Sequence, residues 1–332
     1  MIGVTIGAGV GRLAGLYGLV IDALVSVRMV TAEGQVLEVC SESNPDLFWG
    51  IRGAGANFGV ITSATYKLQP RSDDFTAFDF IFAPSANATY FNALQNLIHG
   101  DGQAASLPAK LAVTTTITYN ATTNQPQILA SWVYAGPQDE AMQVIAPILA
   151  IKAETTVVSR LPWYRVNTDI AFSGDAALCV PDKLVSIYTA NVRKFDAPTY
   201  TSVFQKLTTF FLTHPDAQDS SFLIESFPNQ ATTAVPDDDT AYPWRDSVSH
   251  LLLSITYAKE EPDSAFGNEI RSDLAATSGF DELAAYTNYA HGDEKLEQIY
   301  GKNKLPRLAS LKAKYDPRNV FAFNNPLPSK YP

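Results

Sequence analysis

Over the first 70 residues, apolar and polar positions alternate in short runs separated by glycine-rich stretches. Alternation over residues 24–40, interrupted by a turn at 32–35, predicts a β-hairpin, because strands place successive side chains on opposite faces. Pro45 directly follows polar residues that cap helices well, so a short helix is predicted to begin there. A loop over 52–59 and a strand over 60–68 are expected to complete this part of the chain.

Longer apolar stretches with helical or strand periodicity follow between residues 71 and 285. Because hairpins or single helices join most of the predicted strands, we expect an antiparallel sheet with helices on one face. The tail alternates loops with predicted helices around 294–300 and 305–314. In the middle part, the pattern predicts helices over 90–98 and 138–151, and strands over 111–119, 128–134, 155–161, 184–190, 222–227 and 250–258.

Composition narrows the class of protein. Of 332 residues, 46% are hydrophobic and 17% are charged, which is enough apolar material for a packed core and too little charge for a disordered chain. At roughly 150 residues per domain, the length corresponds to about two domains. The formal net charge of −10 and the lack of a basic run argue against a nucleic-acid partner. No apolar run approaches the roughly 20 residues of a membrane span, so no membrane partner is expected.

Several other signals are missing from the sequence. The two cysteines allow at most one disulfide, and the histidines form no pair at metal-ligand spacing, so we expect no metal site. The N-terminus has neither the charged segment nor the apolar core of a secretory signal peptide. The sequence therefore leaves the location of the protein open.

Glycine is concentrated in two clusters, and eleven of the 19 glycines lie within the first 59 residues. Because glycine permits positive φ and close backbone approach, the clusters predict a backbone-lined binding surface. The first, residues 7–12, begins so early that no strand or helix is expected before it. Its N–H groups suit a pyrophosphate or carboxylate, but its spacing does not match the nicotinamide fingerprint, and a tight structural turn is the alternative. The second, residues 49–61, suits either a loop along a flat ligand or a wide connecting loop.

Three motifs resemble one family in the right order. They are Gly7-Ala8-Gly9-Val10-Gly11-Arg12 with Tyr17-Gly18-Leu19, then Asn44-Pro45-Asp46-Leu47-Phe48-Trp49 running on through Arg52-Gly53-Ala54-Gly55-Ala56-Asn57-Phe58-Gly59-Val60-Ile61-Thr62, and finally Tyr286-Thr287-Asn288-Tyr289 with Tyr315-Asp316-Pro317-Arg318-Asn319-Val320-Phe321. This series is similar to the berberine-bridge-enzyme-like flavin oxidases, which belong to the wider vanillyl-alcohol-oxidase and p-cresol-methylhydroxylase type. The resemblance covers nearly the whole chain.

The resemblance implies an α+β fold. It would combine a partial FAD-binding domain of the vanillyl-alcohol-oxidase type with an antiparallel-sheet substrate domain. The expected divisions are the C-terminal part of the FAD-binding domain (1–70), the substrate domain (71–285) and a segment packing back on the first domain (286–332). The family has a further N-terminal subdomain that holds the pyrophosphate and carries a flavin-linked histidine. This chain starts too late for it, so we expect an N-terminally truncated member that holds FAD weakly or not at all.

The resemblance also implies a set of site residues. Tyr289 is predicted to be the base that takes the substrate hydroxyl proton, and Tyr286 to contact the substrate. Glu225, in a predicted strand, faces either the substrate or water. Without the family context, both tyrosines would be interpreted as sheet residues with buried rings. The residues implied to bind the cofactor are Gly7, Gly9, Gly11, Gly53, Gly55, Asn57, Gly59, Ile61 and Asn288.

The function implied is FAD-dependent oxidation of an alcohol or carbohydrate hydroxyl, with hydride transfer to flavin N5 and reoxidation by O2. The partners would be a small alcohol or sugar substrate and O2. The alternative is a non-catalytic protein, either a relic of a flavoenzyme or a carbohydrate-binding protein. A nicotinamide dehydrogenase is a third possibility that the glycine spacing does not support. Members of the family are often secreted.

Overall fold

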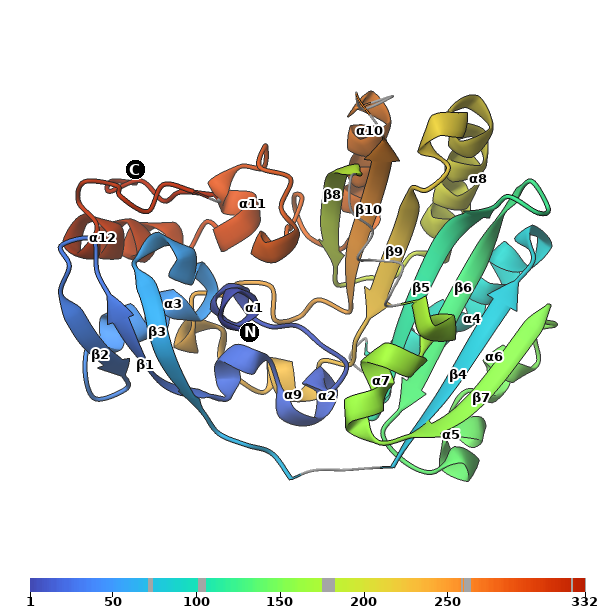
Figure 1. The fold of residues 1–332 in the computed structure, drawn as a ribbon, viewed down its shortest axis with the longest axis horizontal. Coiled ribbons are helices and arrows are strands. Elements are labelled where there is room, and N and C mark those ends of the chain that lie inside the picture. The colour runs from blue at the N-terminus through green and yellow to red at the C-terminus, as the bar shows by residue number, and fades with distance from the viewer. Residues whose placement is uncertain are drawn as a thin grey trace. The chain divides into compact units, whose positions relative to one another are not determined.

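The computed structural model describes residues 1–70, 74–100, 106–174, 183–257, 259, 264–323 and 325–331 (Figure 1). The chain divides into two compact units, each built from separate segments. Unit 1 comprises Met1–Pro70, Asn229–Asp246 and Ala284–Pro332, and unit 2 comprises Arg71–Pro228 and Ser247–Leu283. The residues at 229–246 therefore cluster with the two ends of the chain. The predicted roles of these parts, FAD binding for residues 1–70 with 286–332 and substrate binding for residues 71–285, stay predictions.

Unit 1 contains a small antiparallel sheet with strand order β2-β1-β3. The predicted hairpin at 24–40 is confirmed by the register of β1 and β2, which pairs Val30 with Val36 next to the turn. Gly34 adopts a φ of 77° in that turn, which favours glycine. The elements are α1 (Ile2–Gly7), α2 (Ala14–Tyr17), β1 (Leu24–Val30), β2 (Val36–Cys40), α3 (Pro45–Ala54), β3 (Val60–Tyr66), α9 (Gln230–Thr233), α11 (Leu296–Tyr300) and α12 (Leu305–Tyr315).

The expectation that no helix precedes the first glycine cluster is wrong, because α1 occupies residues 2–7. This helix packs against α3, and a Cβ added at Gly55 would lie only 2.6 Å from the Cβ of Ile6. The hydroxyl groups of Thr5 and Tyr66 also share a hydrogen bond of 2.8 Å. Short helices with β-branched residues are unstable alone, so tertiary contacts hold this one.

The second glycine cluster is more helical than predicted. Helix α3 begins at Pro45 as expected but runs to Ala54, with non-helical backbone angles at Arg52 and Gly53. Gly53 has a φ of 138°, and a Cβ there would lie 2.3 Å from the backbone nitrogen of Tyr242. The kink therefore needs glycine for its conformation and for the close passage of another segment.

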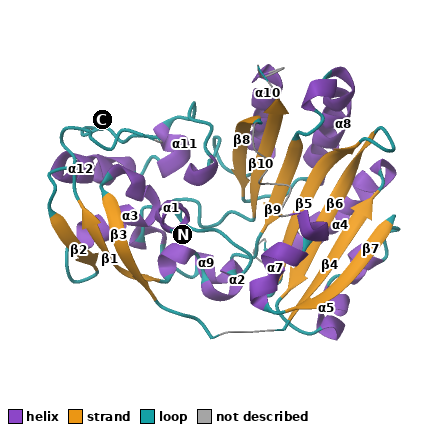
Figure 2. Cartoon of the chain, viewed as in Figure 1, coloured by secondary structure: helices purple, strands orange, loops and turns teal. Residues whose placement is uncertain are grey.

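Unit 2 is built on a seven-stranded sheet of order β7-β4-β6-β5-β9-β10-β8, in which every pair is antiparallel (Figure 2). Its strands are β4 (Phe75–Phe82), β5 (Leu111–Asn120), β6 (Gln125–Tyr134), β7 (Thr155–Leu161), β8 (Leu184–Val192), β9 (Ser221–Ser226) and β10 (Ser249–Tyr257). Its helices are α4 (Asn87–His99), α5 (Gln138–Val144), α6 (Ala146–Leu149), α7 (Trp163–Asp169), α8 (Ala197–Thr213) and α10 (Ser264–Thr277). Among the described residues, the predicted elements of this region are confirmed apart from one helix, and the predicted last residue of the strand over 250–258 lies outside the described residues.

The helix predicted over 138–151 is wrong as a single element. It is divided into α5 and α6 at Ile145. Pro147 lies in the first turn of α6, where its missing N–H costs nothing. Inside a continuous helix the same ring would clash with the carbonyl four residues earlier, so the helix restarts.

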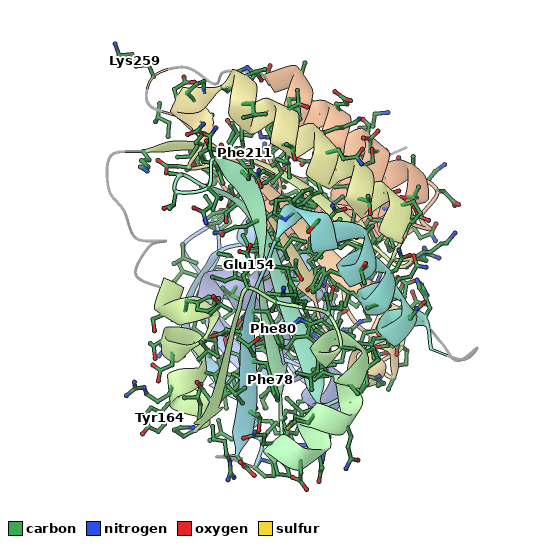
Figure 3. All side chains as sticks on the ribbon, turned by 90° about the vertical axis from the view of Figure 1, so that its right-hand side faces the viewer. Phe78, Phe80, Glu154, Tyr164, Phe211 and Lys259 are labelled. Carbon is green, nitrogen blue, oxygen red and sulfur yellow. The ribbon has the colours of Figure 1, made fainter. Side chains whose placement is uncertain are left out.

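The core of unit 2 lies between the sheet and one layer of helices. Alternate residues of the strands, such as Phe78 and Phe80, pack with apolar side chains of α4, α8 and α10 (Figure 3). Helix α7, which carries Tyr164, lies on the other side of the sheet from α4 and α8 (Figure 3). This confirms the predicted antiparallel sheet with its helices mainly on one face. Among the described residues, no helix is both long and apolar enough to cross a membrane.

Candidate functional site

A pocket of about 820 Å³ lies within unit 1. Its walls come from α1, from the kinked end of α3, from the segment around the short 3₁₀ turn Thr287–Tyr289, and from the C-terminal segment. This volume lies within the range of sites that hold small molecules and cofactors. The predicted site residues on its wall are Gly7, Gly53, Gly55, Asn288 and Tyr289.

Gly7 and Gly55 lie on this wall where another part of the chain passes close to their backbone. A Cβ added at Gly7 would lie 2.2 Å from Oδ1 of Asn288, so no other residue fits there without moving that side chain. The same applies at Gly55, whose added Cβ would meet Ile6. At each of these glycines the backbone closely approaches another part of the same chain. These approaches bring α1, the end of α3 and the segment with Asn288 together around the pocket.

Asn288 is held in place by two acceptors. Its Nδ2 donates to the hydroxyl oxygen of Tyr286 at 2.7 Å and to the carbonyl of Val4 at 3.3 Å. The side chain is exposed, in keeping with its position at the pocket. Asn288 therefore links the C-terminal part of the chain to α1.

Tyr286 and Tyr289 occupy different environments. Tyr286 is only 2% exposed, and its hydroxyl also accepts a hydrogen bond from the backbone N–H of Gly9 at 3.1 Å. Tyr289 is half-buried on the pocket wall, and its ring packs edge-on against Tyr286 with 5.0 Å between centroids. Tyr289 is therefore open to a ligand, whereas Tyr286 supports the wall from behind.

The remaining predicted cofactor residues do not line this pocket. The carboxamide of Asn57 is buried, where its Nδ2 donates to Tyr300 and its Oδ1 accepts from Leu327. A Cβ at Gly59 would collide with the carbonyl of Val30, so this glycine serves strand packing. The residues outside the pocket wall are Gly9, Gly11, Asn57, Gly59 and Ile61.

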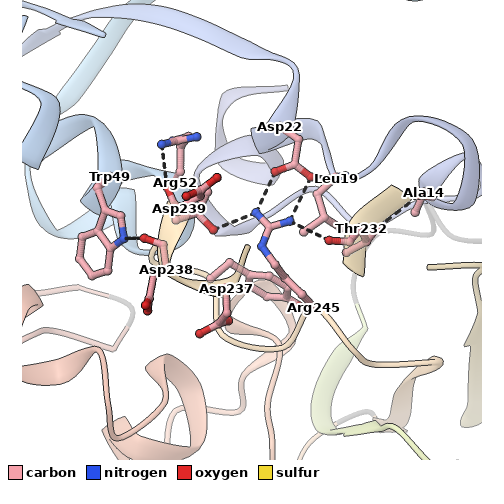
Figure 4. Close-up of polar contacts among 12 residues, drawn as sticks. Ala14, Leu19, Asp22, Trp49, Arg52, Thr232, Asp237, Asp238, Asp239 and Arg245 are labelled. Carbon is pink, nitrogen blue, oxygen red and sulfur yellow. Dashed lines mark hydrogen bonds and ion pairs between the residues drawn. The ribbon is translucent and has the colours of Figure 1, made fainter. Parts of the chain in front are cut away.

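The segment 229–246 is fixed within unit 1 by a buried ion pair that the sequence analysis missed (Figure 4). Arg245 donates to both carboxylate oxygens of Asp22, at 2.8 and 3.1 Å, and also to Thr232 and Thr240. Asp22 in turn accepts from the backbone N–H of Leu19. Asp22 lies three residues after the Tyr17-Gly18-Leu19 part of the first motif, and nothing in the sequence pairs it with a residue 223 positions away.

Two buried lysines fix the C-terminal segment. Lys304 donates to three backbone carbonyls between residues 237 and 242, and burial lowers its pKa. Lys312 donates to Asp316 at 2.7 Å and to the carbonyl of Asn57. Burial raises the pKa of Asp316, but hydrogen bonds from Lys312 and two backbone N–H groups outweigh it, so the net shift is downward. Both lysines hold backbone and take no part in the pocket wall.

Glu225 lies in unit 2, on β9, and is half-buried. Its neighbours along the strand, Ile224 and Ser226, are buried, and Ile224 belongs to the helix-covered core. Strand alternation therefore places Glu225 on the opposite face of the sheet. The register pairs it with Thr114 on β5 and with His250 on β10.

The pocket of unit 1 suits the flavin that the sequence implies. Backbone at Gly53 and Gly55 forms part of its wall, and Asn288 adds a side-chain amide to the same wall. Ile6 and Leu296 add apolar surface of the kind that covers an aromatic ring. No group of three or more His, Cys, Asp or Glu in a metal-binding arrangement occurs among the described residues.

Comparison with known proteins tests the family that the sequence motifs suggest. A family model described as berberine and berberine like matches residues 285–328. The FAD-linked oxidoreductase srdI of Neurospora crassa is 47% identical over 338 residues, and the match covers 100% of this chain and 66% of the relative. The FAD-linked oxidoreductase fogF of Aspergillus ruber is 41% identical over 341 residues, with 100% and 67% covered. The chain thus spans about two thirds of the length of these curated relatives.

Solved structures share the fold. BBE-like 1 of Physcomitrella patens matches with a TM-score of 0.83 at 21% identity, over 100% of this chain and 71% of that chain. The xylooligosaccharide oxidase of Myceliophthora thermophila C1, solved in complex with xylobiose, matches with a TM-score of 0.78 at 20% identity, over 98% and 70%. These likenesses establish the fold, and the identity to the curated relatives establishes the family. The chain therefore belongs to the berberine-bridge-enzyme-like family of FAD-linked oxidoreductases.

Proposed function

We propose that this chain carries the flavin-facing pocket of an FAD-dependent oxidoreductase that oxidises an alcohol or carbohydrate hydroxyl. The observation that carries the proposal is the convergence of Gly7, Gly55 and Asn288, from three distant parts of the sequence, on one pocket. Family membership supports FAD as the cofactor, and the names of the fold relatives support an oxidase. When bound, FAD would supply the electron sink for the oxidation, as a hydride acceptor that O2 reoxidises.

The chain's own residues would do the binding and the proton transfer. Backbone at Gly53 and Gly55 and the amide of Asn288 would hold the cofactor. Tyr286 would keep Asn288 in position, because its hydroxyl accepts from that amide. The contact between Tyr286 and the substrate stays a prediction.

Tyr289 is the proposed base for the hydroxyl proton, with its phenol oxygen as the accepting atom. A tyrosine titrates near 10 in water, so a base at this position needs its anion stabilised by donors or a cation. His291 is the ionisable ring nearest in sequence and lines the same pocket. Glu225, on the sheet of unit 2, is the second candidate for this role.

Fluorescence titration of FAD into the purified chain tests the cofactor site. Gly7→Ala is expected to weaken FAD binding about tenfold or more, because the added Cβ displaces Asn288 from the pocket wall. Gly11→Ala is the matched control, since a Cβ at Gly11 meets nothing within 4 Å and Gly11 does not line the pocket. Equal loss in both variants would contradict the pocket as the cofactor site, since Gly11 does not line it.

A second measurement concerns retention of the cofactor. We expect the chain to hold FAD weakly, so that desalting removes most of the bound flavin. Tight stoichiometric retention would contradict this expectation while supporting the pocket itself. Peroxide formation that depends on an added alcohol or on xylobiose would support oxidation, whereas sugar binding without turnover would favour the non-catalytic alternative.

A further inference from the structure

Two Asn-X-Thr sequences occur in the chain, and the structure gives them different surroundings. They are Asn87-Ala88-Thr89 and Asn120-Ala121-Thr122. An asparagine followed two positions later by Ser or Thr, with no proline between them, is the acceptor sequence for N-linked glycosylation. A glycan is bulky and strongly hydrated, so the asparagine that carries it must lie at the surface of the folded protein. The surroundings of the two side chains therefore separate the two candidates.

Asn120 is the last residue of β5, where the hairpin with β6 turns (Figure 1). The register pairs it with Gln125, and the residues between them, 121–124, are exposed. Asn124 adopts a φ of 55° in this turn, a conformation that asparagine tolerates better than most residues. Asn120 itself is half-buried, and the rest of its acceptor sequence lies on the exposed turn.

The carboxamide of Asn120 can keep its hydrogen bonds when a sugar is attached. Its Oδ1 accepts from the backbone N–H groups of Thr122 at 2.9 Å and Thr123 at 3.3 Å, both at the surface. Its Nδ2 donates to Oε1 of Gln127 at 2.9 Å. A carboxamide nitrogen carries two hydrogens, so a sugar can replace one while the other still donates.

The geometry of the amide sets the direction in which an attached sugar leaves the side chain. An N-substituted amide is planar and trans, so the substituent lies on the same side of the C–N bond as the carbonyl oxygen. At Asn120 this oxygen faces the exposed N–H groups of the turn. A sugar on Nδ2 would therefore emerge beside the turn, at the surface.

The same geometry argues against Asn87, which is the first residue of α4 and half-buried. Its Nδ2 donates to the carbonyl of Pro84 at 2.6 Å, and its Oδ1 is excluded from solvent. A sugar beside that oxygen would have to displace the neighbouring chain. This would disturb the start of a helix whose Tyr90 and Phe91 belong to the core of unit 2.

We propose that Asn120 is an N-glycosylation site and that Asn87 is not. In the reaction, Nδ2 of Asn120 attacks C1 of the first N-acetylglucosamine of an oligosaccharide carried on a lipid diphosphate. The new N–C1 bond replaces the C1–O bond to the diphosphate, which leaves with its lipid. The displaced amide proton passes to a base of the oligosaccharyltransferase, and nothing is oxidised or reduced. The inference is independent of the proposed oxidation, and it implies that the chain enters the secretory pathway.

Expression of the full chain behind a secretion leader in a glycosylating yeast tests the proposal. We expect the intact mass to exceed the mass of the sequence by an N-glycan, and peptide N-glycosidase to remove the excess. That enzyme converts the glycosylated asparagine to aspartate, so peptide mapping identifies the position, which should be Asn120. Cleavage of the leader, read from the N-terminal peptide, shows that the chain has met the transferase.

Three variants assign the glycan to one acceptor sequence. Thr122→Val removes the hydroxyl group that the transferase recognises, at nearly constant volume, and should abolish the whole mass shift. Thr122→Ser keeps an acceptor sequence and should keep the shift. The matched control is Thr89→Val, which removes the other acceptor sequence and should leave the shift unchanged.

All measurements use the total chain, secreted and retained, so a variant that folds poorly still gives a result. A chain whose leader is cleaved but whose mass is unshifted would overturn the site at Asn120. A glycan at Asn87 would contradict the distinction drawn from the two carboxamides. Loss of the shift in Thr89→Val with its retention in Thr122→Val would reverse the assignment.

Discussion

Single residues in this protein are most informative where they are buried and polar. His250 sits on β10 with its Nδ1 bonded to Asn191, in surroundings that exclude water. The net direction of its pKa shift follows from burial alone, which disfavours the charged ring. A buried neutral histidine links the stability of the fold to pH.

The free energy of unfolding should therefore fall as the pH drops from about 6.5 toward 4. In this window the unfolded chain, with a histidine pKa near 6.5, takes up a proton that folded His250, with a pKa of about 4, does not. The full effect is about 3 kcal/mol and is absent above pH 7. Denaturant unfolding at several pH values, compared with His250→Gln, measures it. Parallel pH profiles for both proteins would show that other groups are responsible.

At the scale of elements, ion pairs join segments that lie far apart along the chain. The pair between Arg245 and Asp22 fixes the segment 229–246 beside the first glycine cluster within unit 1. Both side chains are nearly excluded from water. Loss of either side chain should therefore lower the free energy of unfolding much more than loss of one partner of a surface pair. Arg28 and Glu38 form such a surface pair, in which both side chains are more than half exposed.

Arg245→Met is expected to lower the free energy of unfolding by about 3–5 kcal/mol, because it leaves the carboxylate of Asp22 buried without a cation. The double variant Asp22→Asn, Arg245→Met should recover part of this loss, since neither charge remains. Hydrogen exchange should rise first within residues 229–246. Arg28→Met is the surface control and should cost less than about 1 kcal/mol, measured by denaturant unfolding. A similar loss for both single variants would contradict the assigned role.

At the scale of the whole molecule, the chain combines two units with different tasks in the proposed reaction. Unit 1 holds the pocket with Tyr289, and unit 2 carries Glu225 on its sheet. Each unit carries one candidate for the base that takes the hydroxyl proton. A comparison of the two in one assay decides between them.

With saturating FAD and an alcohol that supports peroxide formation, Tyr289→Phe should lower kcat about 10²–10⁴-fold, because the proton acceptor is lost. Its affinity for FAD should stay within about twofold of the wild type. Tyr164→Phe, on the exposed surface of α7, serves as the control and should keep full activity. If Tyr289→Phe retains normal turnover while Glu225→Gln loses it, the base lies on the sheet of unit 2.

Much of the local structure was predictable from the sequence. Alternating residues and a turn with Gly34 identified the hairpin, and Pro45 marked the start of α3. The motif around Tyr286–Tyr289 pointed to the family, and it placed Asn288 and Tyr289 among the predicted site residues, both of which line the pocket of unit 1. These features depend on neighbouring residues and on backbone preferences, which the order of amino acids expresses directly.

Other features depend on contacts between residues far apart in the sequence. Helix α1 exists because it packs on α3, and only the folded chain shows that Gly7 makes room for Asn288 while Gly59 makes room for Val30. The pairing of Glu225 with His250 likewise arises from the register of strands whose order is not the order of the sequence. The sequence by itself determined many of the local elements, the family and the residue types available for chemistry. Tertiary structure alone decided which of them meet, because long-range packing and register are set by the whole fold.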